Sequence, residues 1–283
     1  MAIAAAATLS CSGSTPSLVL TDQVESRRLG ADIRVQFTMA ADAANRAVMA
    51  DTDEASKAAA QDALKARQQV EQDANGLETI LKKLGYTSDV QNLDEFKKQF
   101  DEYKKLDDET LDLAVENTNL KAQRLSFTTG QAAVDAIRKA LDSLPAVARP
   151  GDRSRVEALS ARAEAAALSI QVVQARHIAE SDDQAMTKME EQMAQADAAA
   201  RKELVELRPL IPQAGSSALT DATAALDRLK LVNAEIVQLS RRNTNVRSLA
   251  LALGQKHSIR AKCEAALQAL SDSLAQHEFK ATK

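Results

Sequence analysis

The sequence predicts an all-α fold in which long antiparallel helices form two tandem four-helix-bundle units. Apolar residues make up 45 % of the chain, enough for a continuous core, yet aromatic residues make up only 2 % and tryptophan is absent. The chain is rich in Ala, Leu, Gln, Glu, Lys and Arg, which favour helices, whereas sheets prefer β-branched and aromatic residues. Between the breaks, apolar residues recur every three or four positions, as on one face of a helix.

Proline and glycine divide the chain into eight expected helices. All five prolines lie at an end or a break, and Gly85, Gly130, Gly151, Gly215 and Gly254 mark further breaks. The acidic turns at 51–54 and 180–183 should also cap the helices that follow them. Helices of about 30 residues reach about 45 Å, which favours a bundle. The expected helices cover residues 19–50, 53–84, 92–128, 131–145, 152–180, 182–208, 217–253 and 255–281.

The chain also repeats itself. Ala50-Asp-Thr-Asp-Glu54 corresponds to Ala179-Glu-Ser-Asp-Asp183, and in each half a loop glycine, an Asn-Thr-Asn triplet and a Gly-Gln pair follow in the same order. The spacing is 126 residues between the triplets and 129 between the acidic turns. A tandem duplication is therefore predicted, with the same helix order in both halves. We expect a tail at 1–18, a first four-helix unit at 19–145, a linker at 146–151 and a second unit at 152–283.

Charge and motifs argue against several classes of function. The net charge is −4, and 36 basic residues are interleaved with 40 acidic ones, a pattern typical of solvated helix faces rather than of a nucleic-acid groove. The sequence contains no glycine-rich phosphate loop, paired CxxC, HExxH or nucleophile elbow. We expect no enzyme activity, no cofactor and no nucleic-acid partner.

The first 21 residues carry no charge. The apolar part of this stretch is too short to span a bilayer, which needs about 20 apolar residues. It is read either as the trailing end of a truncated membrane anchor or as a disordered tail. No other segment is expected to cross a membrane.

An asparagine replaces an apolar residue in the apolar seam of each half. Asn117 follows Leu106, Thr110 and Leu113 along its seam, and Asn243 continues a seam through Ile236 and Leu239. A buried amide without partners costs about 1–3 kcal/mol. One interpretation is that the asparagines set helix register, as in coiled coils, so that Asn243→Leu should raise stability or change association. The alternative is a polar pocket for a small ligand. Asn119 and Asn245 lie off the seam.

His177 is a second polar residue on an apolar seam. The repeat places Val48 at the equivalent position, so the packing of the unit does not require a polar group there. A buried, hydrogen-bonded histidine, a ligand-sensing or pH-sensing histidine, and a metal or haem ligand are the open alternatives. Arg241 and Arg242 precede the second triplet and could anchor a carboxylate ligand between helices, although such arginines are common on surfaces.

Two small groups of residues are assigned to the core. Met186, Met189 and Met193 line one face of an expected helix, where methionine fills irregular gaps between helices. Cys263 lies in an apolar run with Ile259 and Ala266, as a small buried residue would.

The segment Leu113-Ala-Val-Glu-Asn-Thr-Asn-Leu-Lys-Ala-Gln-Arg-Leu-Ser126 resembles the third helix of the four-helix-bundle sensor domains of methyl-accepting chemotaxis proteins. The segment 239–254, the stretch 177–183 and the tail 279–282 are similar to parts of such receptors, and the resemblance covers about residues 19–283. It implies a periplasmic sensor that binds a small molecule and shifts a helix. In complete receptors, membrane spans and cytoplasmic signalling modules flank this part; neither is expected within these 283 residues.

The resulting hypothesis is the extracytoplasmic sensor region of an inner-membrane chemotaxis receptor, present as a homodimer and binding a small molecule such as an organic acid. The same sensors precede histidine kinases and cyclases. A structural scaffolding bundle without a ligand is the alternative from another class, and a metal- or haem-binding bundle centred on His177 is a third.

Overall fold

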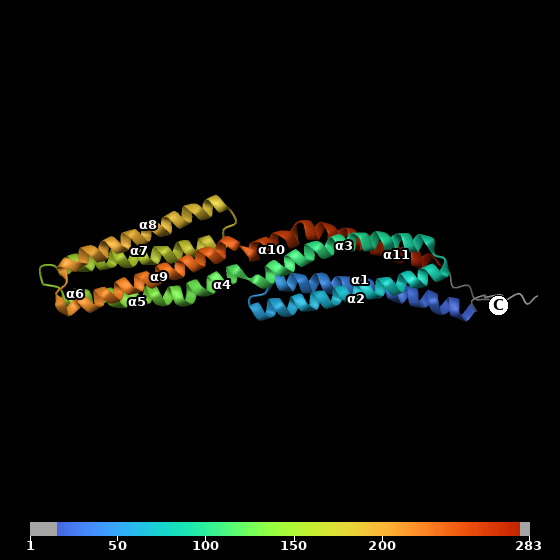
Figure 1. The fold of residues 1–283 in the computed structure, drawn as a ribbon, viewed down its shortest axis with the longest axis horizontal. Helices are drawn as coiled ribbons and strands as arrows, with labels where there is room; N and C mark the ends of the chain where they lie inside the picture. Colours follow the sequence, from blue (N-terminus) through green and yellow to red (C-terminus); the bar gives the residue numbers. More distant parts are fainter. Residues whose placement is uncertain (1–15, 278–283) are drawn as a thin grey trace, which may run out of the picture. The chain divides into compact units, whose positions relative to one another are not determined.

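The computed structural model describes residues 16–277, which fold into helices without a strand in that range, as predicted. The residues expected to form an anchor or tail lie mostly outside the described residues. The long helices are α1 (Pro16–Met49), α2 (Asp53–Leu84), α3 (Thr87–Glu116), α7 (Arg153–Ala179), α8 (Asp183–Leu207), α9 (Ser216–Arg242) and α11 (Gln255–Gln276). The shorter ones are α4 (Thr118–Leu125), α5 (Gln131–Asp142), α6 (Leu144–Val147) and α10 (Thr244–Leu253), with a π-helical turn at Ser126–Gly130 (Figure 1).

Most helix boundaries follow from local chemistry. Helix α1 begins at Pro16, three residues earlier than predicted, because proline fits the first turn of a helix. Thr52 and Asp182 cap α2 and α8, with side-chain oxygens that accept from the amides of Ala55 and Ala185 at 3.1 and 2.7 Å. Gly85 ends α2 with a φ of 72°, a conformation that glycine adopts without strain.

Two predicted helices are interrupted where the sequence shows an unbroken seam. The expected helices 92–128 and 217–253 each stop at an asparagine in the left-handed region, Asn117 with φ 51° and Asn243 with φ 52°. Asparagine tolerates this region better than other residues that have a side chain. At Gly130 and Gly254 the helices resume almost at once, so these glycines do not separate antiparallel helices as expected.

The chain forms two compact units, and they differ from the predicted division. Of the described residues, unit 1 contains 16–49, 56–111 and 251–277, and unit 2 contains 50–55 and 112–250. The two halves do share one helix order: two helices, then a long helix broken at an asparagine. Beyond that break, however, each long helix joins the helices of the other half. The predicted linker at 146–151 lies inside unit 2, because α5 and α7 on either side of it share one core.

Unit 1 is a four-helix arrangement of α1, α2, α3 and α11 (Figure 1). Most of the few aromatic residues of the chain meet in its core. The ring of Phe37 lies 6.1, 5.9 and 5.1 Å from the rings of Phe96, Phe100 and Tyr103. Cys263 is fully buried in the same core, as predicted, and burial raises the pKa of its thiol to about 12.

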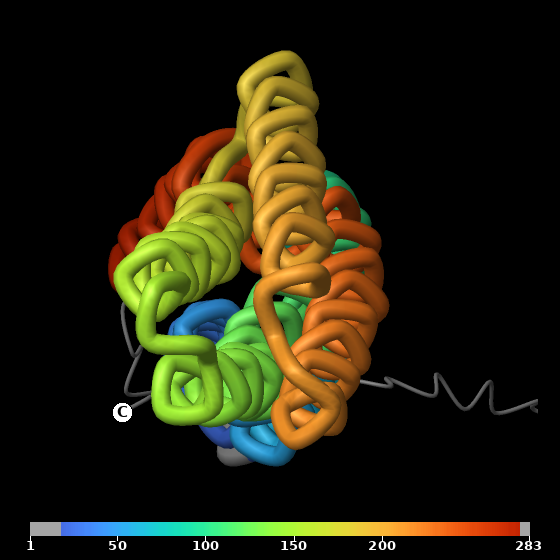
Figure 2. Tube along the Cα trace, turned by 90° about the vertical axis from the view of Figure 1, so that its left-hand side faces the viewer, coloured from blue at the N-terminus to red at the C-terminus, as the bar shows by residue number. Residues whose placement is uncertain are grey.

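Unit 2 packs α5, α7, α8 and α9 around a core of Leu, Ile, Val and Ala, and Figure 2 views these helices nearly end on. Met186, Met189 and Met193 are buried, as the sequence predicts, and Met193 belongs to this core. Near α4 a small separate cluster contains Ala122, Ile178 and Ile236. The buried side chains next to this cluster are mostly polar.

Replacing Phe37 by alanine should lower the free energy of unfolding by about 3–5 kcal/mol, because the ring is buried among three other rings and its removal leaves a cavity. Urea denaturation followed by circular dichroism measures the change. Phe127→Ala is the control, since this ring is 66 % exposed and its loss should cost within about 0.5 kcal/mol. Equal losses in the two variants would contradict the assigned core.

Candidate functional site: an Asn-Thr-Asn hub and a buried histidine

The two Asn-Thr-Asn triplets, residues 117–119 and 243–245, lie against each other in unit 2 and are called the hub below. The first asparagine of each triplet is the break in a long helix, and the next two residues begin a new helix, α4 or α10. The first amides of a helix have no partner within the helix. The amides of both new helices therefore need acceptors from outside.

Each triplet supplies those acceptors to the other. The amide of Thr118 donates to Thr244 Oγ1 at 3.0 Å, and the amide of Thr244 donates to Thr118 Oγ1 at 3.2 Å. In the next position, the amide of Asn119 donates to Asn245 Oδ1 and the amide of Asn245 donates to Asn119 Oδ1, both at 3.1 Å. Each triplet thus provides the N-terminal caps that a Ser, Thr or Asn normally provides within its own helix.

The remaining amide groups of the asparagines close the hub. Asn119 Nδ2 donates to Asn243 Oδ1 at 2.7 Å, and Asn245 Nδ2 donates to Asn117 Oδ1 at 2.9 Å. Arg242 and Glu116, which also lie 126 residues apart, form an ion pair beside it. Contacts between equivalent residues of the two repeats indicate a local twofold relation, as in an isologous interface.

The hub departs from twofold symmetry where it meets the connection between α7 and α8. There Asn243 Nδ2 donates to the carbonyl of Glu180 at 2.7 Å, and Asn119 Nδ2 donates to that of Ile178 at 2.6 Å. Asn117 Nδ2, although buried, has no hydrogen-bond partner among the described residues. The hub is therefore attached to α7 through the second triplet and Asn119.

His177 lies near the end of α7 and is completely buried, as its seam position predicts. Its Nδ1 lies 2.6 Å from Ser240 Oγ on α9, and its Nε2 lies 2.9 Å from Glu190 Oε1 on α8. In a neutral ring that carries its proton on Nε2, Nε2 donates to the carboxylate and Nδ1 accepts from the serine hydroxyl. In a doubly protonated ring, Nδ1 donates instead, and Ser240 can donate to the carbonyl of Ile236 at 2.8 Å. Both protonation states are thus accommodated without an unpaired ring nitrogen.

Arg241 contacts the same carboxylate oxygen as His177. Its Nε donates to Glu190 Oε1 at 2.6 Å, and its other nitrogens reach Asp183 and Thr187 on α8. The hydrogen bond from Arg241, assisted by that from His177, outweighs partial burial and holds the pKa of Glu190 below its usual value of 4.5. A negative Glu190 therefore joins His177 and Arg241.

The polar interior continues along α7 toward the π-helical turn. Ser126 Oγ donates to Gln174 Oε1 at 2.9 Å, and Gln174 Nε2 donates to Asn233 Oδ1 at 2.8 Å. The π-turn adds a residue to the long helix, a device often found at functional positions. A row of polar contacts thus connects α4, α7, α8 and α9 beside the hub.

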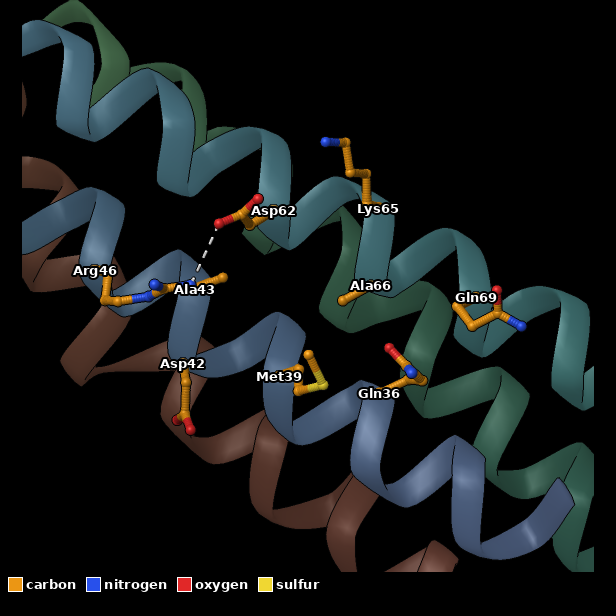
Figure 3. A pocket seen from close by; sticks show the side chains of 9 residues that line it. All are labelled: Gln36, Met39, Asp42, Ala43, Arg46, Asp62, Lys65, Ala66 and Gln69. Atoms are coloured by element: carbon orange, nitrogen blue, oxygen red, sulfur yellow. Dashed lines mark ion pairs between the residues drawn. The ribbon is translucent and has the colours of Figure 1, made fainter. Parts of the chain in front are cut away.

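Grooves lie on the surface of unit 1. One groove of about 560 Å³ lies between α1 and α2, with the buried Ala43 and Ala66 beneath it (Figure 3). Gln36 and Gln69 line it, and an ion pair of 3.5 Å between Arg46 and Asp62 crosses one end. A second groove, of about 460 Å³, is lined by residues of α2 and by Lys104 of α3.

All five residues singled out from the sequence lie in unit 2. Asn117, Asn243 and Arg242 belong to the hub or border it, and His177 and Arg241 meet on Glu190. Sequence reasoning missed the partners that make these positions work: Thr118, Thr244, Glu190 and Ser240, and it placed Asn119 and Asn245 off the seam. The sequence signal for the hub was that all three residues are the same in both triplets, and not only the first asparagine. Among the described residues, no three potential metal-ligating side chains gather, at His177 or elsewhere.

Residues 32–149 match the family of the four helix bundle sensory module for signal transduction, a module of methyl-accepting chemotaxis proteins. This match confirms, for these residues, the resemblance inferred from the sequence. It covers less than half of the 283 residues and follows the first repeat, from within α1 to beyond α6, rather than either unit. No curated protein matches the chain. Within residues 16–277, no helix is both long enough and apolar enough to cross a bilayer.

Exchanging Asn243 for leucine should lower stability, not raise it as the unbroken seam suggests. Leucine at φ 52° costs about 1–2 kcal/mol, and loss of the amide removes one partner of the buried Asn119 amide and the partner of the part-buried Glu180 carbonyl, at about 1–3 kcal/mol. Asn243→Gly avoids the backbone cost, so urea denaturation should rank wild type above glycine and glycine above leucine. Asn75→Leu on the exposed face of α2 is the control. A leucine variant as stable as wild type would show that the hub contributes nothing.

Because the pKa of Glu190 is lowered in the folded protein, the free energy of unfolding of unit 2 should depend on pH. An ionised Glu190 stabilises the fold; this contribution is complete above pH 4.5 and is lost as the pH falls through the lower folded-state pKa. Glu190→Gln should therefore unfold at a lower temperature at pH 7 and show a smaller further loss on acidification than wild type. Thermal melts across this pH range test it, with the exposed neighbour Glu191→Gln as control. Parallel pH profiles for wild type and Glu190→Gln would refute the assignment.

Proposed function

We propose that this chain is the extracytoplasmic sensor region of a methyl-accepting chemotaxis receptor, which binds a small molecule and transmits a helix displacement across the membrane. The proposal starts from the family match of residues 32–149. The observation that carries it further is the path of the long helices. Helix α3, most of which lies in unit 1, leads into α4 and α5 of unit 2, and α9 of unit 2 leads through α10 into α11 of unit 1; the hub lies in unit 2 and joins these two long helices.

The hub couples these two long helices. Four backbone amides are capped by the opposite triplet, so a shift of one helix along its axis would leave amides in both helices without acceptors. A displacement that starts at α9 therefore moves α4 with it, or it must break the hub. The side chains that the sequence suggested as ligand contacts bind one another and neighbouring helices instead. We therefore assign them to the transmission of the helix displacement. They are Asn117, Asn243, His177, Arg241 and Arg242.

A homodimer is part of the proposal, and α1 supports it. Six large apolar side chains on this helix are 47–73 % exposed; apart from Leu18, the other five share one side of it. At 3.6 residues per turn they fall within about 100° around the helix, a stripe wide enough for a partner helix. They are Leu20, Val24, Val35, Met39 and Met49. Exposed apolar side chains on one side of a helix commonly mark a protein interface. The exposed charges of Arg28, Asp42 and Arg46 lie on the same side.

The rival proposals differ in what they require. A sensor for a histidine kinase or a cyclase would use the same helices, so the output module separates these from a chemotaxis receptor. A scaffolding bundle would bind no small molecule. A metal or haem bundle would need a free ring nitrogen on His177, whereas both nitrogens lie within hydrogen-bond distance of Ser240 and Glu190.

The proposed sensing is tested by screening organic acids and amino acids against the full chain by thermal shift, with titration calorimetry on each hit. Hydrogen exchange with and without a hit should show altered protection at residues 116–119 and 242–245, because the hub transmits the change. In Asn243→Gly the affinity should persist while the change at 116–119 shrinks. If nothing binds, the scaffolding alternative gains; if binding leaves hub exchange unchanged, the transmission role of the hub is wrong.

A further inference from the structure

A group of charged and polar side chains lies buried in unit 1, outside the hub. Asp107 and Tyr103 on α3 are fully buried, and Arg67 on α2 and Lys256 on α11 are only 9 % and 3 % exposed. Lys256 Nζ lies above the ring of Tyr103, 5.5 Å from the ring centroid, beside the apolar core of unit 1. These four residues are called the Arg67 cluster below.

Positive charge exceeds negative charge inside this cluster. Asp107 is the single buried carboxylate, and it is shared: Oδ2 lies 2.8 Å from Arg67 Nη1, and Oδ1 lies 2.5 Å from Lys256 Nζ. Asp108 also contacts Arg67 Nη1, at 2.7 Å, but its side chain is 58 % exposed, so water screens its charge. Two buried cations thus face one buried anion. Burial lowers the pKa of Lys256 despite the neighbouring Asp107.

Donors in the cluster lack acceptors. Arg67 Nε and Tyr103 Oη are buried and have no hydrogen-bond partner among the described residues. Lys256 Nζ carries three N–H bonds but contacts one carboxylate oxygen. Buried polar groups are nearly always paired, and an unpaired one costs about 1–3 kcal/mol. The cluster therefore has surplus donors and surplus positive charge, and a single anionic acceptor would satisfy both.

A route from solvent reaches the cluster at Arg67. This residue lines the groove of about 460 Å³ on α2 and α3, together with Leu64, Lys65, Gln68 and Lys104. Lys104 is paired with Glu71 and Asp101, but Lys65, Arg67 and Lys104 outnumber Glu71 in the lining of the groove, and this excess of positive charge favours the approach of an anion. Arg67 thus belongs to both the groove and the buried cluster.

We propose that unit 1 binds a small monovalent oxyanion, a carboxylate group above all, between α2, α3 and α11, with Arg67, Tyr103 and Lys256 as its donors. Arg67 would supply its Nε, Lys256 an unused ammonium hydrogen and Tyr103 its hydroxyl, while Asp107 holds the two cations in place. That the anion is the signal read by the sensor rests on the proposed function; the site itself rests on these contacts alone.

Because the chain has few fluorescent side chains, binding at the proposed site can be followed by fluorescence. There is no tryptophan and there are two tyrosines, Tyr86 and Tyr103. In Tyr86→Phe the fluorescence of the chain therefore comes from Tyr103. Titration of this variant with sodium acetate, and separately with sodium nitrate, should give a saturable change, with the bulky sulfonate HEPES keeping the ionic strength constant. Tyr103→Phe, which retains Tyr86, should give none.

Calorimetry of acetate binding then assigns the donors. Tyr103→Phe keeps the ring and the charges but removes one donor, so affinity should fall about 10- to 100-fold, the usual effect of a hydrogen bond to a charged group. Lys256→Met should abolish saturable binding, and the exposed Lys262→Met on the same helix should bind as wild type does. Circular dichroism checks that each variant is folded.

Saturation by both anions would indicate recognition of an oxyanion, and saturation by acetate alone would indicate recognition of a carboxylate; both support the site. No saturable signal, or equal affinity in wild type and Tyr103→Phe, would overturn it. If acetate binds here without altering exchange at the hub, the site stands and the proposed sensing fails. If another compound from the screen binds and acetate does not, the site fails and sensing stands.

Discussion

Two helices that are interrupted by left-handed asparagines would ordinarily be weak at that point, because each new helix begins with amides that have no acceptor. In this chain the interruptions are stable because each Asn-Thr-Asn triplet caps the helix that follows the other triplet. These hydrogen bonds can form only if the two helix breaks lie side by side in the bundle. The course of both long helices, the exchange of helices between the repeats and the attachment of α7 to the hub all depend on this reciprocal capping.

The exchange explains why the repeats and the structural units differ. A duplicated segment that folded on itself would bury its own last helix. Here the last helices of the two repeats change places, so each unit contains parts of both. Residues 32–149, which match a four-helix sensory module, consequently lie in both units. One repeat alone would leave the triplet without its partner and the helix beyond it without its neighbours.

The interiors of the two units have different chemistry. Unit 1 concentrates aromatic side chains and encloses the Arg67 cluster, whereas most buried polar side chains of unit 2 bind one another in the hub and along α7, with Asn117 Nδ2 and Ser160 Oγ as exceptions. A closed polar network gives register and rigidity but leaves few groups for a ligand. A cluster with unpaired donors is where a ligand would be stabilised. We therefore place the proposed recognition in unit 1 and the coupling in unit 2.

The sequence by itself determined the all-α class, most helix ends, the duplication and the burial of His177, Cys263 and the three methionines. These follow from local periodicity, from caps and from breaks, all of which act over a few residues. It singled out Asn117 and Asn243 but predicted continuous helices through them, because a seam pattern carries no information on a single left-handed residue. Only the tertiary structure decided that Asn119 and Asn245 complete the hub, that Glu190 joins His177 to Arg241, and which helices share a core. Those features depend on contacts between separate helices, from 13 positions apart for His177 and Glu190 to 126 for Asn119 and Asn245, and further still for α1 and α11. Such contacts are made by the packing of whole helices rather than by any local pattern.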